Sequence, residues 1–343
     1  MPILELPHNP IPVYYLGGHQ IRAYRGVGPE VGLVSPEDWV GSTTARPNGP
    51  VGPDGIASGL SVVADGRTVV SLLRADPASW VGTDLSDGDS GVLVKLLDPG
   101  ERIPVHWHPD PVFARLHLGM AHGKAEAWVV LSDTARVWLG FAEGTSMGAL
   151  RAAIDRQDGE WMLKRMHEFD LQRGDTVFVP PGLVHAIEAG SLLAEVQEPA
   201  TTSILAEHDR FGLDGDRATL GAGWDAALGC LLAPSDRRGV AALVGTLPTT
   251  PGEHRPFPVE ADRYFSSRVV EVAGGGGFPV DRLTVALVDG GRLTLEDLAD
   301  GTVVVAREGS AWLLGATTGD VSVTGTGRLL LFAAPGGGTD QPA

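Results

Sequence analysis

The chain has 343 residues, 43% of them hydrophobic and 20% charged, which fits a globular protein of one large or two ordinary domains. The formal net charge of -17 repels nucleic acid, and no cluster of lysine and arginine offsets that repulsion. Nucleic acid is therefore not an expected partner. The single cysteine, Cys230, excludes an intramolecular disulfide and fits a cytoplasmic location. The sequence has no secretion-signal pattern and no long apolar run, so a membrane is not an expected partner either.

The composition favours a mostly β protein, because 47 glycines and 25 prolines punctuate the chain and long helical patterns are few. In the opening third, short β-rich runs at Val62-Val63, Val69 to Leu73 and Val92 to Leu97 predict strands. The densest strand pattern runs from residue 91 to about 199. Strands at this spacing predict a barrel or a double-sheet jelly roll.

Helical patterns interrupt this region at about 145–167 and at 217–232, so we expect helical insertions there. We expect a domain at 1–232 that holds the chemistry, a linker at 233–262 and a smaller β-sandwich or β-barrel domain at 263–336. No histidine follows His254, so the C-terminal domain is expected to lack metal ligands. Residues 336–343, GGGTDQPA, are expected to form a frayed end.

Two motifs bring histidines together. Gly100 is followed after five residues by His106-Trp107-His108, and in a strand both imidazoles face one side while Trp107 faces the other. Gly174 is followed after five residues by Pro180-Pro181-Gly182, and His185 comes three residues later. The paired motifs form the cupin signature, which predicts a double-stranded β-helix, or jelly roll, around a metal site.

The cupin pattern normally has a glutamate about four residues after its second histidine, and this chain has none there. Glu126 is the best candidate for the missing carboxylate. It opens the run AEAWVVL, in which strand alternation places Glu126 and Trp128 on one face and Ala125, Ala127 and Val129 on the other. The predicted metal ligands are therefore His106, His108, Glu126 and His185.

The segments VKLLDPGERIPVHWHPD, HGKAEAWVVL, QRGDTVFVPPGLVHAI and LAEVQEP resemble the type I mannose-6-phosphate isomerases, especially their short bacterial members. The resemblance covers residues 91 to 199 well and the rest of the chain loosely. It implies metal ligands at His108, Glu126 and His185, with His106 where the family has glutamine. The family's lysine beside the ligand glutamate is retained as Lys124, two residues from Glu126 and on the same strand face.

A second departure concerns phosphate recognition. After the E-V-Q-E segment the family usually has T-T-Y-R, whereas this chain has Thr201-Thr202-Ser203-Ile204. An uncharged residue, Ile204, thus stands where the resemblance leads us to expect an active-site arginine. The substrate class therefore stays open between a sugar phosphate and an unphosphorylated sugar.

The resemblance implies a metal-dependent aldose–ketose isomerase that converts mannose 6-phosphate to fructose 6-phosphate, or acts on a related sugar, through a stabilised enediolate. Zn²⁺ is the first choice of metal, with Mn²⁺, Fe²⁺ and Ni²⁺ as alternatives. Lys124 would add positive charge, while Asp110, His122, Glu195 and Glu198 are candidate proton carriers that the sequence does not distinguish. Asp110 equally suits a cap of the turn after Pro109.

Two other functions remain open at this stage. Three imidazoles and one carboxylate also suit a mononuclear metal oxygenase of the cupin type. The missing arginine equally fits a sugar-binding cupin that keeps its metal without catalysis. The sequence does not determine the oligomeric state.

Overall fold

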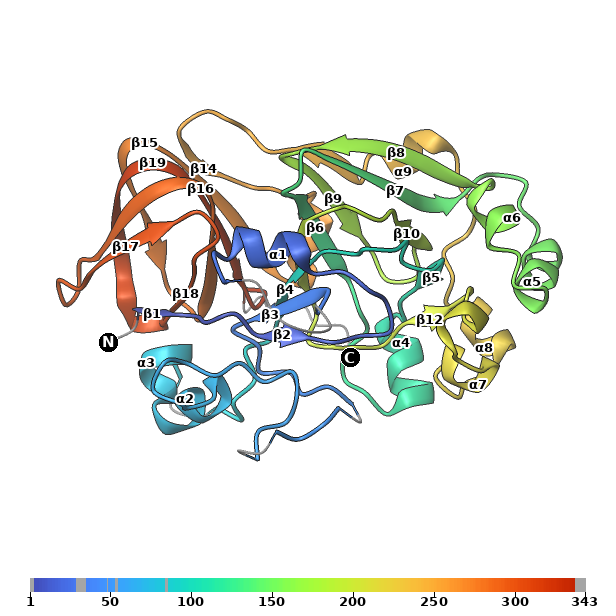
Figure 1. The fold of residues 1–343 in the computed structure, drawn as a ribbon, viewed down its shortest axis with the longest axis horizontal. Helices are drawn as coiled ribbons and strands as arrows, with labels where there is room; N and C mark the ends of the chain where they lie inside the picture. The colour runs from blue at the N-terminus through green and yellow to red at the C-terminus, as the bar shows by residue number, and fades with distance from the viewer. Residues whose placement is uncertain (1–2, 29–34, 48, 53–54, 84–85, 337–343) are drawn as a thin grey trace.

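The computed structural model describes residues 3–28, 35–47, 49–52, 55–83 and 86–336. These residues form three antiparallel sheets with short helices around them (Figure 1), which confirms the mostly β prediction. The expected frayed end lies outside the described residues, apart from Gly336. No helix in the described ranges is both long and apolar enough to cross a bilayer.

Two sheets are built mainly from the region with the densest strand pattern. The seven-stranded central sheet has the order β13-β9-β6-β11-β4-β3-β2, with bounds Val244–Thr246, Asp175–Val179, Glu126–Val130, Leu193–Gln197, Leu93–Leu97, Glu37–Val40 and Pro10–Ile11. The five-stranded outer sheet has the order β12-β5-β10-β7-β8, with bounds Ile204–Leu205, His106–Trp107, His185–Ile187, Thr134–Phe141 and Met166–Gln172.

The third sheet, here called the C-terminal sheet, forms the orange and red part of Figure 1. Its order is β1-β18-β16-β19-β15-β14, and β17 pairs with β16. The strands are Ile3–Glu5, Ala311–Leu314, Thr284–Asp297, Gly319–Ala333, Ser266–Val280 and Gly252–His254, with β17 at Val303–Arg307.

Short helices cover the sheet ends and the outer sheet. They are α1 (His19–Tyr24), α2 (Val69–Ala75), α3 (Pro77–Val81), α4 (Pro111–Phe113), α5 (Met147–Asp155), α6 (Gly159–Leu163), α7 (Gly215–Ala218), α8 (Trp224–Gly229) and α9 (Arg237–Ala241). A π-helical turn lies at Ala114–Leu118, and 3₁₀ turns lie at Asp209–Phe211, Val259–Arg263 and Ala316–Thr318.

Both predicted helical insertions are present. The first contains α5, where the Ser146 hydroxyl accepts a hydrogen bond from Ala149 N at 3.2 Å, and α6. The second is divided into α7 and α8, and Leu220 between them has a left-handed φ of 58°. The helical pattern at 217–232 therefore forms two short helices with a break.

The strand predicted at Val69 to Leu73 is wrong, because these residues lie in α2. The Thr68 hydroxyl caps the helix by accepting from Ser71 N at 3.1 Å. Val69, Leu72 and Leu73 are buried, and their spacing of three and four residues places them on one helical face. The β-branched residues that suggested a strand are thus outweighed by a cap and a helical burial pattern.

Strand alternation sorts the side chains into layers. In β6, Trp128 and Val130 face the outer sheet, while Ala127 and Val129 face the C-terminal sheet. In β7 of the outer sheet, Val137 packs toward the central sheet. Trp138 points the other way, into an apolar cluster with residues of the helical insertions. The space between the central and outer sheets is therefore enclosed on both sides by packed layers.

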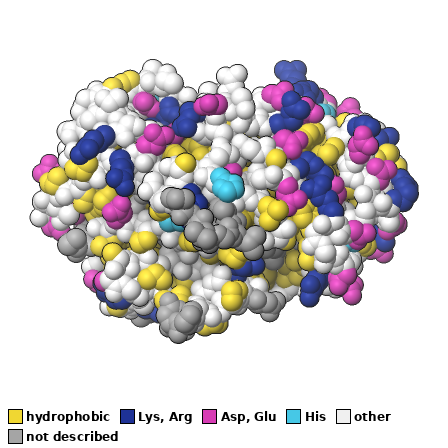
Figure 2. All heavy atoms as spheres, in the orientation of Figure 1, with side chains coloured by type: hydrophobic (Ala, Val, Ile, Leu, Met, Phe, Trp, Pro, Cys, Tyr) yellow, Lys and Arg dark blue, Asp and Glu magenta, His cyan; other side chains and the backbone are white. Residues whose placement is uncertain are grey.

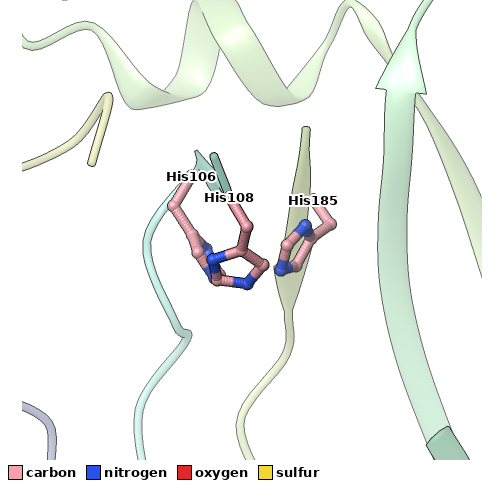
Figure 3. A group of neighbouring side chains, drawn as sticks. All are labelled: His106, His108 and His185. Carbon is pink, nitrogen blue, oxygen red and sulfur yellow. The ribbon is translucent and has the colours of Figure 1, made fainter. Parts of the chain in front are cut away.

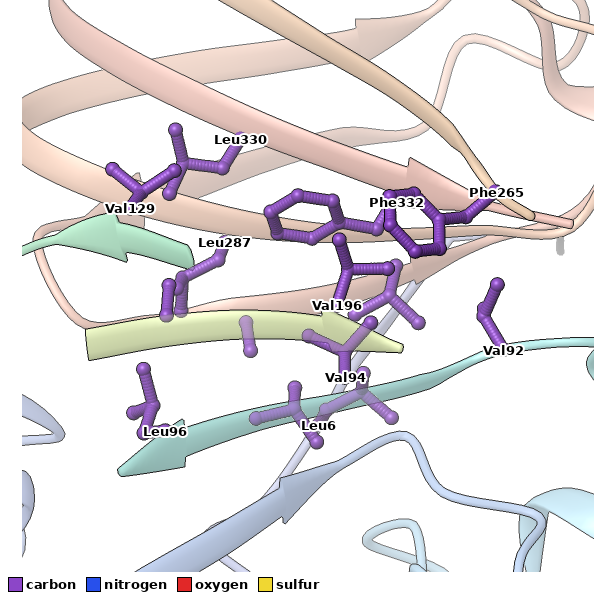
Figure 4. Close-up of a cluster of buried hydrophobic side chains, with 14 of the residues drawn as sticks. Leu6, Val92, Val94, Leu96, Val129, Val196, Phe265, Leu287, Leu330 and Phe332 are labelled. Carbon is purple, nitrogen blue, oxygen red and sulfur yellow. The ribbon is translucent and has the colours of Figure 1, made fainter. Parts of the chain in front are cut away.

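The central and C-terminal sheets share one hydrophobic core. Figure 4 shows Leu96, Val129 and Val196 of the central sheet beside Leu287 and Leu330 of the C-terminal sheet. Phe265 and Phe332 complete the same buried cluster. This continuous packing indicates that the two parts stabilise each other.

The chain crosses the expected domain boundaries. Strand β1, at the N-terminus, pairs with β18 of the C-terminal sheet, so the segment 1–232 is not a self-contained unit. The segment 233–262, expected as a linker, contains β13, which pairs with β9, and β14, which pairs with β15. It connects the two parts through hydrogen-bonded strands. Acidic and basic side chains are interspersed on the face shown in Figure 2.

Replacing Leu287 with alanine tests the shared core. Leu287 is fully buried between the sheets, so its truncation should lower the free energy of unfolding by about 2–5 kcal/mol in urea denaturation. The matched variant Leu298→Ala, at a side chain that is 57% exposed, should change it by no more than about 0.5 kcal/mol. Equal losses in the two variants would contradict the shared core.

Candidate metal centre and its cavity

Three histidines meet between the central and outer sheets. His106 in β5 lies directly opposite His185 in the antiparallel strand β10, and His108 follows at the end of β5. Trp107 faces away into the helical layer, where its indole N–H donates to Ala227 O at 3.1 Å. The three imidazole rings point toward one another (Figure 3), as the H-x-H spacing predicts.

The imidazoles are arranged as metal ligands are. One ring nitrogen from each of His106, His108 and His185 lies within 4.8 Å of the others. Each Nδ1 faces a backbone carbonyl, at Pro104 for His106, Thr202 for His108 and Leu183 for His185, with distances of 2.8–2.9 Å. A carbonyl only accepts, so each Nδ1 carries the proton and each Nε2 keeps its lone pair for a cation.

Glu126 supplies a carboxylate to the same point. Its Oε2 lies 2.9 Å from His108 Nε2, and its Oε1 lies 3.1 Å from His185 Nε2. His185 Nε2 is buried and has no hydrogen-bond partner among the described residues, whereas Glu126 Oε2 is ion-paired with Lys124 Nζ. A buried polar atom without a partner is rare, and a cation would satisfy His185 Nε2. The Glu126 carboxylate therefore contacts two of the three histidines.

Lys124 lies beside this group. Its Nζ is 2.8 Å from Glu126 Oε2 and 3.1 Å from His108 Nε2. The backbone explains the closeness, because Lys124 N donates to Pro109 O at 2.9 Å. At Gly123 an added Cβ would lie 2.7 Å from the same oxygen, so only glycine allows this approach.

The local environment keeps the imidazoles neutral and the carboxylate charged. Burial lowers the pKa of His106 well below its usual range and lowers the pKa of His108 to about 3. Burial alone would raise the pKa of Glu126, but Lys124 and the two neighbouring imidazoles hold it well below its ordinary value. Neutral imidazole and ionised carboxylate are the forms that bind metal.

A second buried charge cluster lies on the neighbouring strands of the central sheet. Lys95 Nζ is 3.5 Å from Glu37 Oε2 and 3.3 Å from Glu195 Oε1. Glu37 also accepts hydrogen bonds from the Tyr15 hydroxyl and the Trp39 indole, both at 2.7 Å. Burial and the nearby Glu126 raise the pKa of Glu195, whereas Lys95 and these hydrogen bonds outweigh burial and lower the pKa of Glu37.

A cavity of about 840 Å³ connects the two clusters. A volume of this size suits a small metabolite. Of the site residues predicted from the sequence, those that line it are His106, Lys124, Glu126, His185 and Glu195.

No protein-family model matches the chain. The probable mannose-6-phosphate isomerase GmuF of Bacillus subtilis is 27% identical over 256 residues, which cover 70% of this chain and 74% of GmuF. The mannose-6-phosphate isomerase ManA of the same organism is 32% identical over 127 residues, which cover 36% of this chain and 39% of ManA. The chain is therefore similar in sequence to mannose-6-phosphate isomerases of Bacillus subtilis.

Solved structures extend the likeness along the chain. The crystal structure of the mannose 6-phosphate isomerase from Bacillus subtilis has a TM-score of 0.71 at 21% identity, covering 97% of this chain and 99% of that one. A mannose 6-phosphate isomerase bound with zinc and yttrium also has a TM-score of 0.71, at 13% identity, and covers 97% and 99% of the two chains. At these identities the likeness establishes the fold.

Three of the candidate proton carriers do not line the cavity. Asp110 caps α4, with its Oδ1 accepting from Phe113 N at 2.7 Å. Glu198 Oε2 accepts from Ala125 N at 2.9 Å, and its Oε1 lies 3.6 Å from Nδ1 of His122, whose side chain is 45% exposed. Glu198 thus holds the residue that precedes β6, and Glu195 alone of the four candidates lines the cavity.

Ile204 lies outside the cavity. Its side chain is buried with Trp107 in the apolar cluster beneath the helices, and the two residues are register partners. The next residue, Leu205, pairs with His106 and is also uncharged. Strand β12 therefore offers no cation on either face.

Lys95 and Glu37 were not among the predicted site residues. Lys95 lies in the run GVLVKLL and Glu37 in PEDWV, and both strands are buried on both faces. A charged residue inside such an apolar run is rare, so it could have indicated a functional site. The contact between Lys95 and Glu37 is long-range and could not be obtained from spacing.

The lowered pKa values of His106 and His108 predict how stability depends on pH. Below about pH 6.5 an unfolded imidazole binds a proton that the buried imidazole of the metal-free protein does not. The free energy of unfolding should therefore fall as the pH is lowered from 6.5 toward 4, by up to about 1.4 kcal/mol per pH unit for each histidine.

Thermal and urea unfolding of metal-free protein at several pH values measures this slope. His108→Gln removes one of the two groups and should reduce the slope, while His117→Gln, at an exposed side chain, should leave it unchanged. An identical slope in the His108 variant and the parent protein would contradict the assignment.

Proposed function

We propose that the protein is a metal-dependent aldose–ketose isomerase that acts on mannose 6-phosphate or a related aldose. One observation carries the proposal, namely three buried imidazoles and the Glu126 carboxylate converging at a cavity that also holds Lys124 and Glu195. The names of the relatives support this reaction. Cys230, unpaired and buried, is compatible with action in the cytoplasm.

His106, His108, His185 and Glu126 would hold the metal. Zn²⁺ is our first choice because it takes imidazole and carboxylate ligands in four-coordinate sites, with Mn²⁺, Fe²⁺ and Ni²⁺ as alternatives. When bound, such a cation supplies Lewis-acid stabilisation of negative charge on the C1 and C2 oxygens of the sugar.

The chain's own groups would handle charge and protons. The Lys124 ammonium, held beside Glu126, adds positive charge where an enediolate oxygen develops. Glu195 would carry the proton between C1 and C2, because it lines the cavity and because burial and the nearby Glu126 raise its pKa, which favours a group that both accepts and returns a proton.

Substituting the ligands tests the metal centre. Glu126→Gln and His185→Asn should lose stoichiometric zinc and turnover together, because each removes a donor from a buried four-ligand site. Metal analysis and exchange of the sugar C2 proton with deuterated water provide the two measurements. His117→Asn, at an exposed histidine, is the matched control and should keep both. Full turnover in metal-free protein would contradict the proposal.

Glu195→Gln tests the proton carrier separately. This variant should bind zinc normally and lose turnover by about 10²- to 10⁴-fold, the usual contribution of general acid–base catalysis. Glu198→Gln and Asp110→Asn, at residues outside the cavity lining, should retain turnover. A Glu195 variant with normal turnover would remove its assigned role, and zinc binding without C2 exchange in the parent protein would favour a sugar-binding function.

A further inference from the structure

Two arginines line the cavity without a partner among the described residues. Arg46 lies in the loop after β3, and Arg217 lies in α7 of the second helical insertion. Neither guanidinium makes an ion pair or a hydrogen bond within the described ranges. Their backbones are fixed, since Arg46 N donates to Ser58 O at 2.7 Å and Arg217 N donates to the Asp214 carboxylate at 2.8 Å.

The other charged side chains around the cavity are already paired with one another. Lys95 is held between Glu37 and Glu195, and Lys124 is paired with Glu126. These five groups are buried.

The two arginines lie farther out than that buried set. Arg46 is half-buried and Arg217 is exposed. One carboxylate, Asp216, is also exposed among the residues that line the cavity. Two guanidiniums against one carboxylate leave an excess of positive charge toward solvent.

We propose that Arg46 and Arg217 form an anion subsite that binds the phosphate group of a phosphorylated aldose, and this inference rests on the proposed function for the reaction at the metal centre. A guanidinium presents paired N–H donors that match phosphate oxygens. In a hexose 6-phosphate the phosphate lies at the opposite end of the carbon chain from C1 and C2. A sugar with its reacting carbons at the buried ligands therefore extends its phosphate toward the outer part of the cavity.

The neighbouring residues fit the same role. Thr201 also lines the cavity, and a threonine hydroxyl can hydrogen-bond to a phosphate oxygen. Strand β12, which follows Thr201 in the chain, carries the apolar pair Ile204 and Leu205 and supplies no cation. The positive charge for a phosphorylated substrate must therefore come from other elements, and the loop after β3 and α7 provide it.

The experiment compares phosphorylated and free sugar in the zinc-loaded full-length protein. For Arg46→Gln, Arg217→Gln and the double variant, kcat/KM is measured with mannose 6-phosphate and with mannose. The ratio of the two values should fall about tenfold in each single variant and about a hundredfold in the double variant. Arg238→Gln, at an exposed arginine of another short helix, should leave the ratio unchanged. An unchanged ratio in the double variant would overturn the subsite.

Calorimetric binding of mannose 6-phosphate to the same proteins separates the two proposals. Loss of affinity in the double variant supports the subsite even if no sugar exchanges its C2 proton, a result that would overturn the isomerase function alone. Exchange that proceeds with equal affinity for mannose 6-phosphate in the parent and double variant would overturn the subsite alone.

Discussion

The site depends on a row of ionisable side chains held between two sheets, where each charge must have a partner. An unpaired charge in such a place costs several kcal/mol, so the carboxylates and cations occur together. Glu126 is shared by Lys124 and two imidazoles, and Lys95 is shared by two glutamates. Strand alternation produces this arrangement, since every second residue of each strand faces the same space.

The packing on either side keeps this polar layer in place. The helical insertions cover the outer sheet with an apolar cluster, and the C-terminal sheet covers the central sheet with the shared core. The C-terminal part thus contributes no predicted ligand yet supports the strands that carry Glu126 and Glu195. In Figure 1 the two parts lie side by side, with the N-terminal strand β1 joining the sheet of the C-terminal part.

Much of the site could be predicted from local pattern. Period-two spacing correctly placed His106 and His108 together, and it correctly divided Trp128 from Ala127 and Val129. Contacts between distant strands could not be obtained this way, which is why Lys95 was missed. The helix at Val69–Ala75 shows a second limit, because β-branched residues suggested a strand where a Thr68 cap and helical burial decide the structure. The uncharged residue at Ile204 could be recognised in the sequence. The place of Arg217 at the cavity could be recognised only in the three-dimensional structure.

Crystallography of the zinc-loaded protein with anomalous scattering at the zinc edge tests the central claim most directly. The account predicts one ion per chain, with Nε2 of His106, His108 and His185 and an oxygen of Glu126 at about 2.0–2.2 Å. An ion bound elsewhere, or bound without His185 and Glu126, would contradict it.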